Sequence, residues 1–309
     1  MTTRLMRTAA ALGLAAALTW PAALAEEPVL MQPPPPEGEV LTPALWTIEK
    51  PGGGTVALFG SVHLLQSGQN WRTEAFEAAF AKADVVVFET PIADMATPEL
   101  QAYVAQSMMN PPGVTLSTLL DAGEKATVEK AATEIGAPFS ALEPLRPWMA
   151  GLQLAIGFAM KQGFGPEAGV DKVIEAEARA AGKAADYFET AREQLDIFTT
   201  MTSDEEIAFL VVGAETMLED PDQLKDLVAA WGRGDAAAID AIMNAGLEET
   251  PELGKRLLED RNARWVTKIE SAYLADGKSY LIVVGAGHLA GPKSVQAMLR
   301  AKGIEVSGP

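Results

Sequence analysis

Residues 280–288 read YLIVVGAGH, and residues 55–63 read TVALFGSVH. Each stretch is an apolar run rich in β-branched or aromatic residues, which favours a buried strand, and each run ends at a glycine. A histidine stands three residues after each glycine, at His63 and at His288, and the sequence contains no other histidine. The two stretches therefore predict two buried strands whose ends carry both histidines of the chain.

Two acidic residues stand at matching points of the sequence. VVVFET ends in Glu89-Thr90, and ADYFET ends in Glu189-Thr190. In open α/β sheets, ligands bind beyond the carboxyl ends of the strands. We therefore expect His63, Glu89, Glu189 and His288 to meet at one edge of a central sheet. Taken one by one, a histidine at a strand end can be a structural hydrogen-bonding group, and a glutamate there can cap the next helix.

Long helical stretches separate the strand candidates, which predicts crossover connections and a largely parallel sheet. The fold class is therefore α/β, with a mainly parallel central sheet flanked by helices and with long helical insertions that form a cap. Two β-rich runs around PGGG, at 51–54, predict a β-hairpin at the start of the domain.

Several element boundaries follow from local signals. The pattern predicts a helix at 73–82, a helix start at Thr97-Pro98, and a helix at 293–302. A capping box of Ser203 and Glu206 is expected to open a helical block that extends to about 276. Further strands are expected at 84–88, 184–188 and 304–306.

The first 25 residues have the composition of a secretory signal peptide. Arg4 and Arg7 precede an apolar run, and Ala23-Leu24-Ala25 provides the small residues that signal peptidase requires. The run is shorter than the roughly 20 residues that span a bilayer. Residues 26–39 are rich in proline and predict an extended linker. A single domain is then expected over residues 40–309 of an exported protein, periplasmic or secreted.

Composition limits the partners of the chain. The formal net charge is −18, which argues against nucleic acid and anionic membrane surfaces. No later segment is long and apolar enough to predict a membrane span after signal cleavage. The sequence has no cysteine, so any metal ligands must come from histidine, aspartate and glutamate. A peptide or small-molecule substrate remains the expected partner, and the sequence leaves the oligomeric state open.

Two imidazoles and two carboxylates are suitable ligands for a divalent transition metal such as Mn, Co or Zn. We expect His63, His288, Glu189 and Glu89 to provide the metal ligands. A bound metal would lower the pKa of water for hydrolysis. One carboxylate could instead remain off the metal as a general base, and Glu89 is the preferred choice for that role because it follows the first histidine motif closely.

The motifs TVALFGSVHLL, VVVFET, GVDKVIEAEARAAGKAADYFETAREQLDIF, EDRNARWVTKI and YLIVVGAGHLAG together resemble the TraB/GumN family. That family includes the Tiki proteases and is more distantly similar to ChaN-like and erythromycin-esterase-like proteins. The resemblance covers residues 44–306. It implies an α/β fold with a site between the two GxxH segments, and, for the Tiki branch, metal-dependent protease activity.

The resemblance also assigns individual residues. The residues that match family motif positions are His63, Glu89, Asp171, Glu189, Gln194, Arg261, Asn262 and His288. Ser61 departs from the pattern, because the family often has threonine there. From the residues alone, Arg261 is interpreted as a surface arginine paired with Glu259 or Asp260. The resemblance instead implies that Arg261 reaches the site to bind a substrate carboxylate or an oxyanion.

The role of Asp171 is left open at this point, and so is the function itself. Asp171 either caps the helix that follows it or belongs to the site. The favoured function is an exported metal-dependent hydrolase that acts on peptides, with His63, Glu89, His288 and Arg261 as catalytic residues. One alternative is a non-catalytic envelope protein that binds a metal, a haem-like molecule or a small signal molecule in the same pocket. Another is an accessory envelope protein whose site is vestigial.

The leader interpretation makes a direct prediction. Signal peptidase should cleave after Ala25, so the mature protein should begin at Glu26. N-terminal sequencing of protein from the native envelope fraction should read EEPVL. An intact Met1 on protein recovered in the membrane pellet would contradict the prediction.

Overall fold

The computed structural model describes residues 40–247 and 251–309, and side chains from 244 to 247 are outside this description. The predicted signal peptide and linker, residues 1–39, therefore lie outside the described residues. Within the described ranges, no helix is long and apolar enough to cross a bilayer.

A five-stranded sheet forms the centre of the fold, with strands in the order β1-β2-β7-β4-β6. The bounds are β1 (Leu45–Glu49), β2 (Thr55–Ser61), β4 (Val85–Phe88), β6 (Ala184–Tyr187) and β7 (Tyr280–Gly285). β1 runs antiparallel to β2, and every other neighbouring pair is parallel. The predicted hairpin and the mainly parallel α/β sheet are confirmed. The hairpin turns at Gly53 and Gly54, whose φ angles of 89° and 82° lie where glycine has no steric cost.

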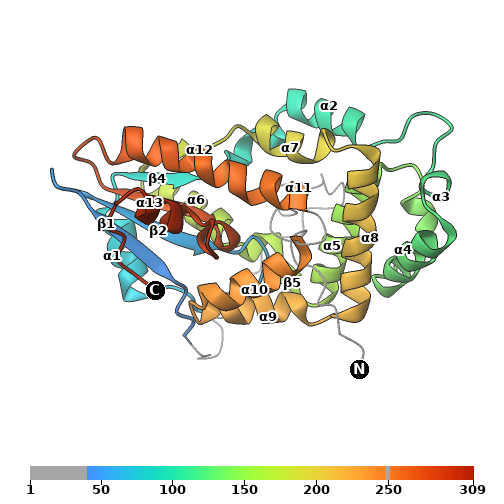
Figure 1. Ribbon diagram of the computed structural model, residues 1–309, viewed down its shortest axis with the longest axis horizontal. Helices are drawn as coiled ribbons and strands as arrows, with labels where there is room; N and C mark the ends of the chain where they lie inside the picture. The colour runs from blue at the N-terminus through green and yellow to red at the C-terminus, as the bar shows by residue number, and fades with distance from the viewer. Residues whose placement is uncertain (1–39, 248–250) are drawn as a thin grey trace.

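Helices cover both faces of the sheet, so the main body has three layers (Figure 1). One face packs against α1 (Glu74–Lys82), α6 (Val170–Ala180), α9 (Gln223–Gly232) and α10 (Ala236–Leu247). The other face packs against α12 (Asp260–Lys268), η6 (Ile269–Tyr273) and α13 (Val295–Ala301). The strands of the middle are therefore buried on both sides, which explains their continuous apolar runs.

The remaining helices form a block at one end of the sheet (Figure 1). Its own core joins α3 (Leu116–Leu119), α4 (Ala122–Glu134), α5 (Pro147–Lys161), α8 (Ser203–Glu219), α7 (Ala191–Thr199), α11 (Pro251–Gly254) and η5 (Lys255–Glu259). A small antiparallel pair, β3 (Leu65–Gln66) with β5 (Phe164–Gly165), connects the chain after β2 to the end of α5. This block is the predicted helical cap.

Short elements complete the chain. They are η2 (Ile92–Ala96), α2 (Pro98–Ser107), η3 (Phe139–Ala141), η4 (Pro166–Ala168) and η7 (Ala286–Leu289). The predicted start of α2 at Thr97-Pro98 is confirmed, because Thr97 caps the helix and accepts from the Leu100 N–H.

Two local predictions were wrong: the cap of α8 lies one residue earlier than expected, and the expected last strand does not form among the described residues. Thr202, with Glu205, forms the capping box of α8, whereas Glu206 is buried and accepts hydrogen bonds from Arg146 and from the Trp148 N–H. The strand expected at 304–306 is absent from the described chain, where an isolated bridge joins Thr47 to Ser307. β2 pairs with one edge of β1, and the C-terminal segment contacts the opposite edge of β1 through this single bridge.

Candidate functional site

The carboxyl ends of β2, β4 and β7 lie side by side, and this register places the site. Ser61 at the end of β2 pairs with Gly285 at the end of β7, and Phe88 at the end of β4 pairs with Val283. His63 follows the end of β2, His288 follows the end of β7, and Glu89 follows the end of β4. Parallel pairing therefore brings these three side chains, distant in sequence, to one edge of the sheet.

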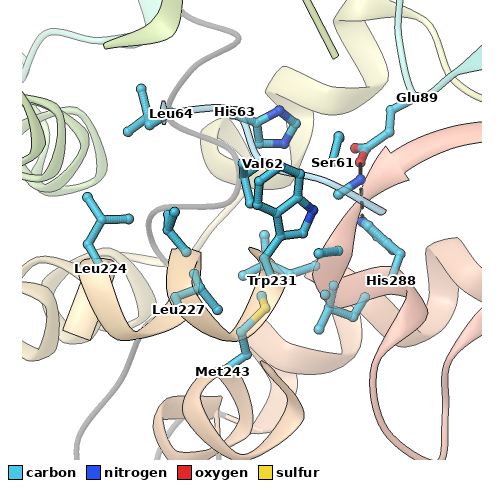
Figure 2. A pocket seen from close by; sticks show the side chains of 16 residues that line it. Ser61, Val62, His63, Leu64, Glu89, Leu224, Leu227, Trp231, Met243 and His288 are labelled. Carbon is cyan, nitrogen blue, oxygen red and sulfur yellow. Dashed lines mark hydrogen bonds and ion pairs between the residues drawn. The ribbon is translucent and has the colours of Figure 1, made fainter. Parts of the chain in front are cut away.

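Gly285 marks the point at which the three side chains meet. A Cβ atom built on Gly285 would lie 3.2 Å from Glu89 Oε1, 3.6 Å from His63 Nε2 and 3.7 Å from His288 Cδ2. The Gly285 N–H also donates to Glu89 Oε1 over 2.7 Å. The absence of a side chain here leaves room that the two rings and the carboxylate share. His63, Glu89 and His288 all line one cavity, which Figure 2 shows from close by.

Arg261 in α12 is fully buried and lies between the acids and one histidine. Its Nη2 donates to Glu89 Oε2 over 2.6 Å, and its Nε donates to the two oxygens of Glu189 over 2.9 and 3.0 Å. Its Nη1 donates to His288 Nε2 over 3.0 Å and also to the carbonyl of Leu257. The surface position that the residues alone suggested for Arg261 is wrong, because its partners are Glu89 and Glu189.

Glu189 is close to the site but does not line the cavity among the described residues. Its Oε1 also accepts from Trp265 Nε1 over 3.1 Å and from Arg264 over 3.2 Å. With these donors and the Arg261 Nε, the carboxylate is surrounded by positively polarised N–H groups. Glu189 therefore holds Arg261 in place, and its oxygens are committed to that role.

His63 has one committed and one uncommitted ring nitrogen. Nδ1 lies 2.8 Å from Asp171 Oδ2, while Nε2 faces the cavity near Gly285. Burial opposes protonation, but the charge and hydrogen bond of Asp171 outweigh it and raise the pKa of His63 to about 9. Asp171 is the second residue of α6, whose N-cap is Gly169, so the open question of its role is answered by this contact with His63.

His288 is held as a neutral ring. Burial and the neighbouring guanidinium of Arg261 lower the pKa of His288 to about 3. Arg261 can only donate, so His288 Nε2 is the acceptor in their bond. Nδ1 therefore carries the hydrogen and donates to Asn262 Oδ1 over 2.6 Å. The Asn262 amide nitrogen donates to the carbonyl of Lys293, which fixes the orientation of that side chain.

Glu89 is an ionised carboxylate at neutral pH. Burial alone would favour the protonated acid, but the charge of Arg261 and the Gly285 N–H are among the contacts that outweigh it and lower the pKa of Glu89 to about 2. Gln194 in α7 adds a further donor, 3.3 Å from Glu89 Oε2. A carboxyl group with so low a pKa is a weak base and a ready ligand.

The donor set partly fits a divalent cation. In many metal sites each histidine ligand donates its second ring N–H to an oxygen, and here His63 does so to Asp171 and His288 to Asn262. Both Nε2 atoms and Glu89 Oε1 lie around the space beside Gly285 that a side chain would otherwise fill. His288 Nε2 is engaged by Arg261, however, and the described part of the chain contains no ready-made group of three such ligands. Glu189 does not line the cavity, and its Oε1 already accepts from Arg261, Arg264 and Trp265, so it fits a ligand position less well.

Sequence reasoning missed the apolar wall of the cavity and the donors around Glu189. The wall includes Leu224, Val228 and Trp231, spaced four and three residues apart along α9. That spacing was readable as an amphipathic helix, but the same pattern describes any helix that packs on a core. Trp265 likewise gave no signal that separated a core aromatic from a hydrogen-bond donor.

We expect Arg261 to support the fold as well as the site. Replacing Arg261 with methionine removes the cation that two buried carboxylates share and leaves Glu189 with the exposed Arg264 alone, which should lower the free energy of unfolding by about 3–5 kcal/mol. The matched control is Arg264→Met, because Arg264 contacts the same glutamate but its side chain is 62 % exposed, and it should cost less than about 1 kcal/mol. Urea unfolding of both variants provides the measurement, and equal costs would contradict the prediction.

The two histidines should give the metal-free protein a stability maximum near pH 6.5. The folded pKa of His288 is depressed to about 3, so its contribution is present above the unfolded value of 6.5 and is lost on acidification. The folded pKa of His63 is raised to about 9, so its contribution is complete below 6.5 and is lost as pH rises through 9.

Urea unfolding in chelator between pH 5 and 9 tests this. His288→Gln should flatten the acid side of the curve most clearly just below pH 6.5, well above the unfolded pKa of Glu89, 4.5. His63→Gln should flatten the alkaline side. Variants whose slopes match that of the unmodified protein would show that the rings do not titrate as described.

Comparison with known proteins adds a family to this geometry. Residues 44–308 match the TraB/PrgY/gumN family, and this range contains every residue of the site. A comparison with curated proteins gives no match. Since the match covers nearly the whole described domain, the chain belongs to the TraB/PrgY/gumN family.

Proposed function

We propose that this chain is an exported hydrolase that uses a divalent cation and acts on peptide bonds. The observation that carries the proposal is the arrangement at Gly285, where His63 Nε2 and Glu89 Oε1 lie within 4 Å of one point and the His288 ring edge borders it. The family match supports a shared site but does not itself specify the reaction.

Three side chains would hold the cation: His63 and His288 through Nε2, and Glu89 through Oε1. A divalent cation at this place supplies a lowered water pKa and a polarised substrate carbonyl. Glu89 is already ionised, as a ligand must be, and His63 must give up the proton that Asp171 stabilises on its ring. Glu89 is thus proposed as a ligand, and Glu189 is no longer proposed as one.

Arg261 has two parts in this proposal. It compensates the charge of both glutamates, and its Nη1 now occupies the lone pair of His288 Nε2. For a cation to bind, Arg261 Nη1 must first release His288 Nε2. The same N–H can then donate to an oxygen of the substrate. A buried guanidinium aimed at developing negative charge is a common way to stabilise an oxyanion.

The apolar character of the cavity helps such chemistry. Leu64, Leu227 and Trp231 line the cavity together with the ionised groups. Their presence lowers the local polarity, which strengthens the interaction between a charged group and a developing charge. The His63 ring, with Asp171 behind it, is the group through which protons can enter or leave this enclosed space.

The test combines elemental analysis with a peptidase assay. Pure protein should retain a divalent metal, lose hydrolysis of a mixed peptide pool in chelator, and recover it with Mn²⁺, Co²⁺ or Zn²⁺. His63→Ala, His288→Ala and Glu89→Gln should each lose the metal and at least about 10²-fold in rate. Asp171→Asn should weaken metal affinity by about 10–100-fold, because it orients a ligand without binding the metal.

The matched control is Glu99→Gln, an exposed glutamate of α2, which should change neither property. Chelated protein that still turns over, or histidine variants with full activity, would overturn the proposal. Retained metal without hydrolysis of any peptide would favour a second candidate, a protein that binds a metal or a small signal ligand in this cavity. The existing bond between Arg261 and His288 favours the small-ligand form of that candidate, because it engages one of the three proposed metal ligands.

A further inference from the structure

The cavity beside the histidines has an apolar wall that the proposed chemistry does not require. Leu224, Val228 and Trp231 project into it from one face of α9, and Leu64 adds to it directly after His63. Figure 2 shows Leu224 and Leu227 on the side of the cavity away from Glu89 and His288, with Trp231 between the two sides. The cavity therefore has a polar end at the strand termini and an apolar end at α9.

The wall is anchored to the same strand that carries His63. Trp231 Nε1 donates to the carbonyl oxygen of Gly60 over 2.7 Å, and both groups are buried. Leu224 packs with Leu64 and with Phe164 of β5 in a small core of its own. These contacts fix the distance between the apolar end and the ligand end, so the cavity can select by shape.

Charge is confined to the polar end. Among the described residues that line the cavity, Glu89 and His63 are the only side chains that are ionised at neutral pH. No lysine, arginine or aspartate of the described chain lines the α9 side. A charged substrate group placed there would lose its hydration without gaining a partner, which is strongly unfavourable.

Ser61 provides a polar contact that the protein itself leaves unused. Its side chain is 2 % exposed, it lines the cavity, and its Oγ has no hydrogen-bond partner. Buried hydroxyl groups without a partner are rare, and each calls for an explanation such as a ligand or an ordered water. In Figure 2, Ser61 lies close to Glu89, at the polar end of the cavity. The Ser61 hydroxyl is thus available to a bound molecule.

The size of the cavity suits a single side chain. The space open to the centre of a water-sized sphere is about 60 Å³. One water needs about 10–15 Å³ by this measure, so the cavity holds a few waters or one medium-sized apolar group.

We infer that the cavity binds one uncharged, apolar side chain of the substrate, next to the bond that is cut, and that the Ser61 hydroxyl hydrogen-bonds the substrate backbone beside it. Leu224 and Val228 then determine specificity, and Ser61 positions the substrate. This inference rests on the proposed hydrolase function for the identity of the ligand as a substrate, but the binding preference can be measured without turnover.

Calorimetry in chelator tests the preference with blocked dipeptides, N-acetyl-Xaa-Ala-amide, where Xaa is Leu, Phe, Asn, Lys or Glu. Leu and Phe should bind at least tenfold more tightly than Lys and Glu. Val228→Asp introduces a carboxylate into the wall at a half-buried position and should abolish the preference for Leu and favour Lys. The matched control is Ala229→Asp, one residue along α9 and exposed, which should leave the preference unchanged.

Ser61→Ala should weaken binding of every dipeptide about tenfold while the thermal unfolding midpoint stays the same or rises, because the lost hydroxyl had no partner in the free protein. Ser61→Thr, which restores a hydroxyl, should recover binding. A fall in the unfolding midpoint with unchanged affinity would show a structural role for Ser61 and would overturn its part of the inference.

The two proposals fail in different ways. Apolar preference in chelator without metal-dependent hydrolysis would remove the enzymatic proposal and leave the cavity inference standing. Hydrolysis that shows equal kcat/KM for Leu, Lys and Glu substrates would overturn the cavity inference alone. Equal binding of all five dipeptides by the unmodified protein would likewise overturn it.

Discussion

The site depends on one buried guanidinium. Glu89 and Glu189 follow two neighbouring parallel strands, so the sheet itself brings two carboxylates into buried positions next to each other. Arg261 pairs with each of them and supplies one positive charge that both carboxylates share. The guanidinium also donates to His288 and so fixes its tautomer. Removing this cation would change the charge, the tautomer and the packing of the site together, which is why its stability and its chemistry are coupled.

The helix that carries Arg261 is built unusually. α12 is flanked by two π-helical segments, η5 and η6, which widen the helix before and after it. Arg261, Asn262 and Trp265 of this helix are all buried, and each bonds to the site: Arg261 to both glutamates, Asn262 to His288, and Trp265 to Glu189. π-helical turns recur at functional sites. Here they flank the helix that directs these three side chains towards the site.

The sequence was sufficient to predict the sheet and the histidine ends, because buried parallel strands are continuous apolar runs and glycine breaks mark their ends. It was not sufficient for Arg261, since EDRNAR is indistinguishable from a charged surface helix until strands far away in the chain supply the carboxylates. The same reason explains Glu189: its position at a strand end was predicted, but the donors from α12 that engage its oxygens were not. The cap of α8 was misplaced because adjacent residues, Thr202 and Ser203, are both good N-caps followed by a glutamate three residues on.

The two histidines share a motif and differ in chemistry. Both follow a glycine at the end of a buried strand, yet the pKa of His63 is raised to about 9 and that of His288 is lowered to about 3. The difference comes from the partners: Asp171 faces one ring, and Arg261 faces the other. A symmetric motif thus produces an asymmetric site, with an ionised ring open to the cavity and a neutral ring locked on both nitrogens. Any ligand that uses both Nε2 atoms must therefore displace a proton from His63 and a guanidinium N–H from His288. Its affinity should then depend on both Asp171 and Arg261, although neither has to touch it.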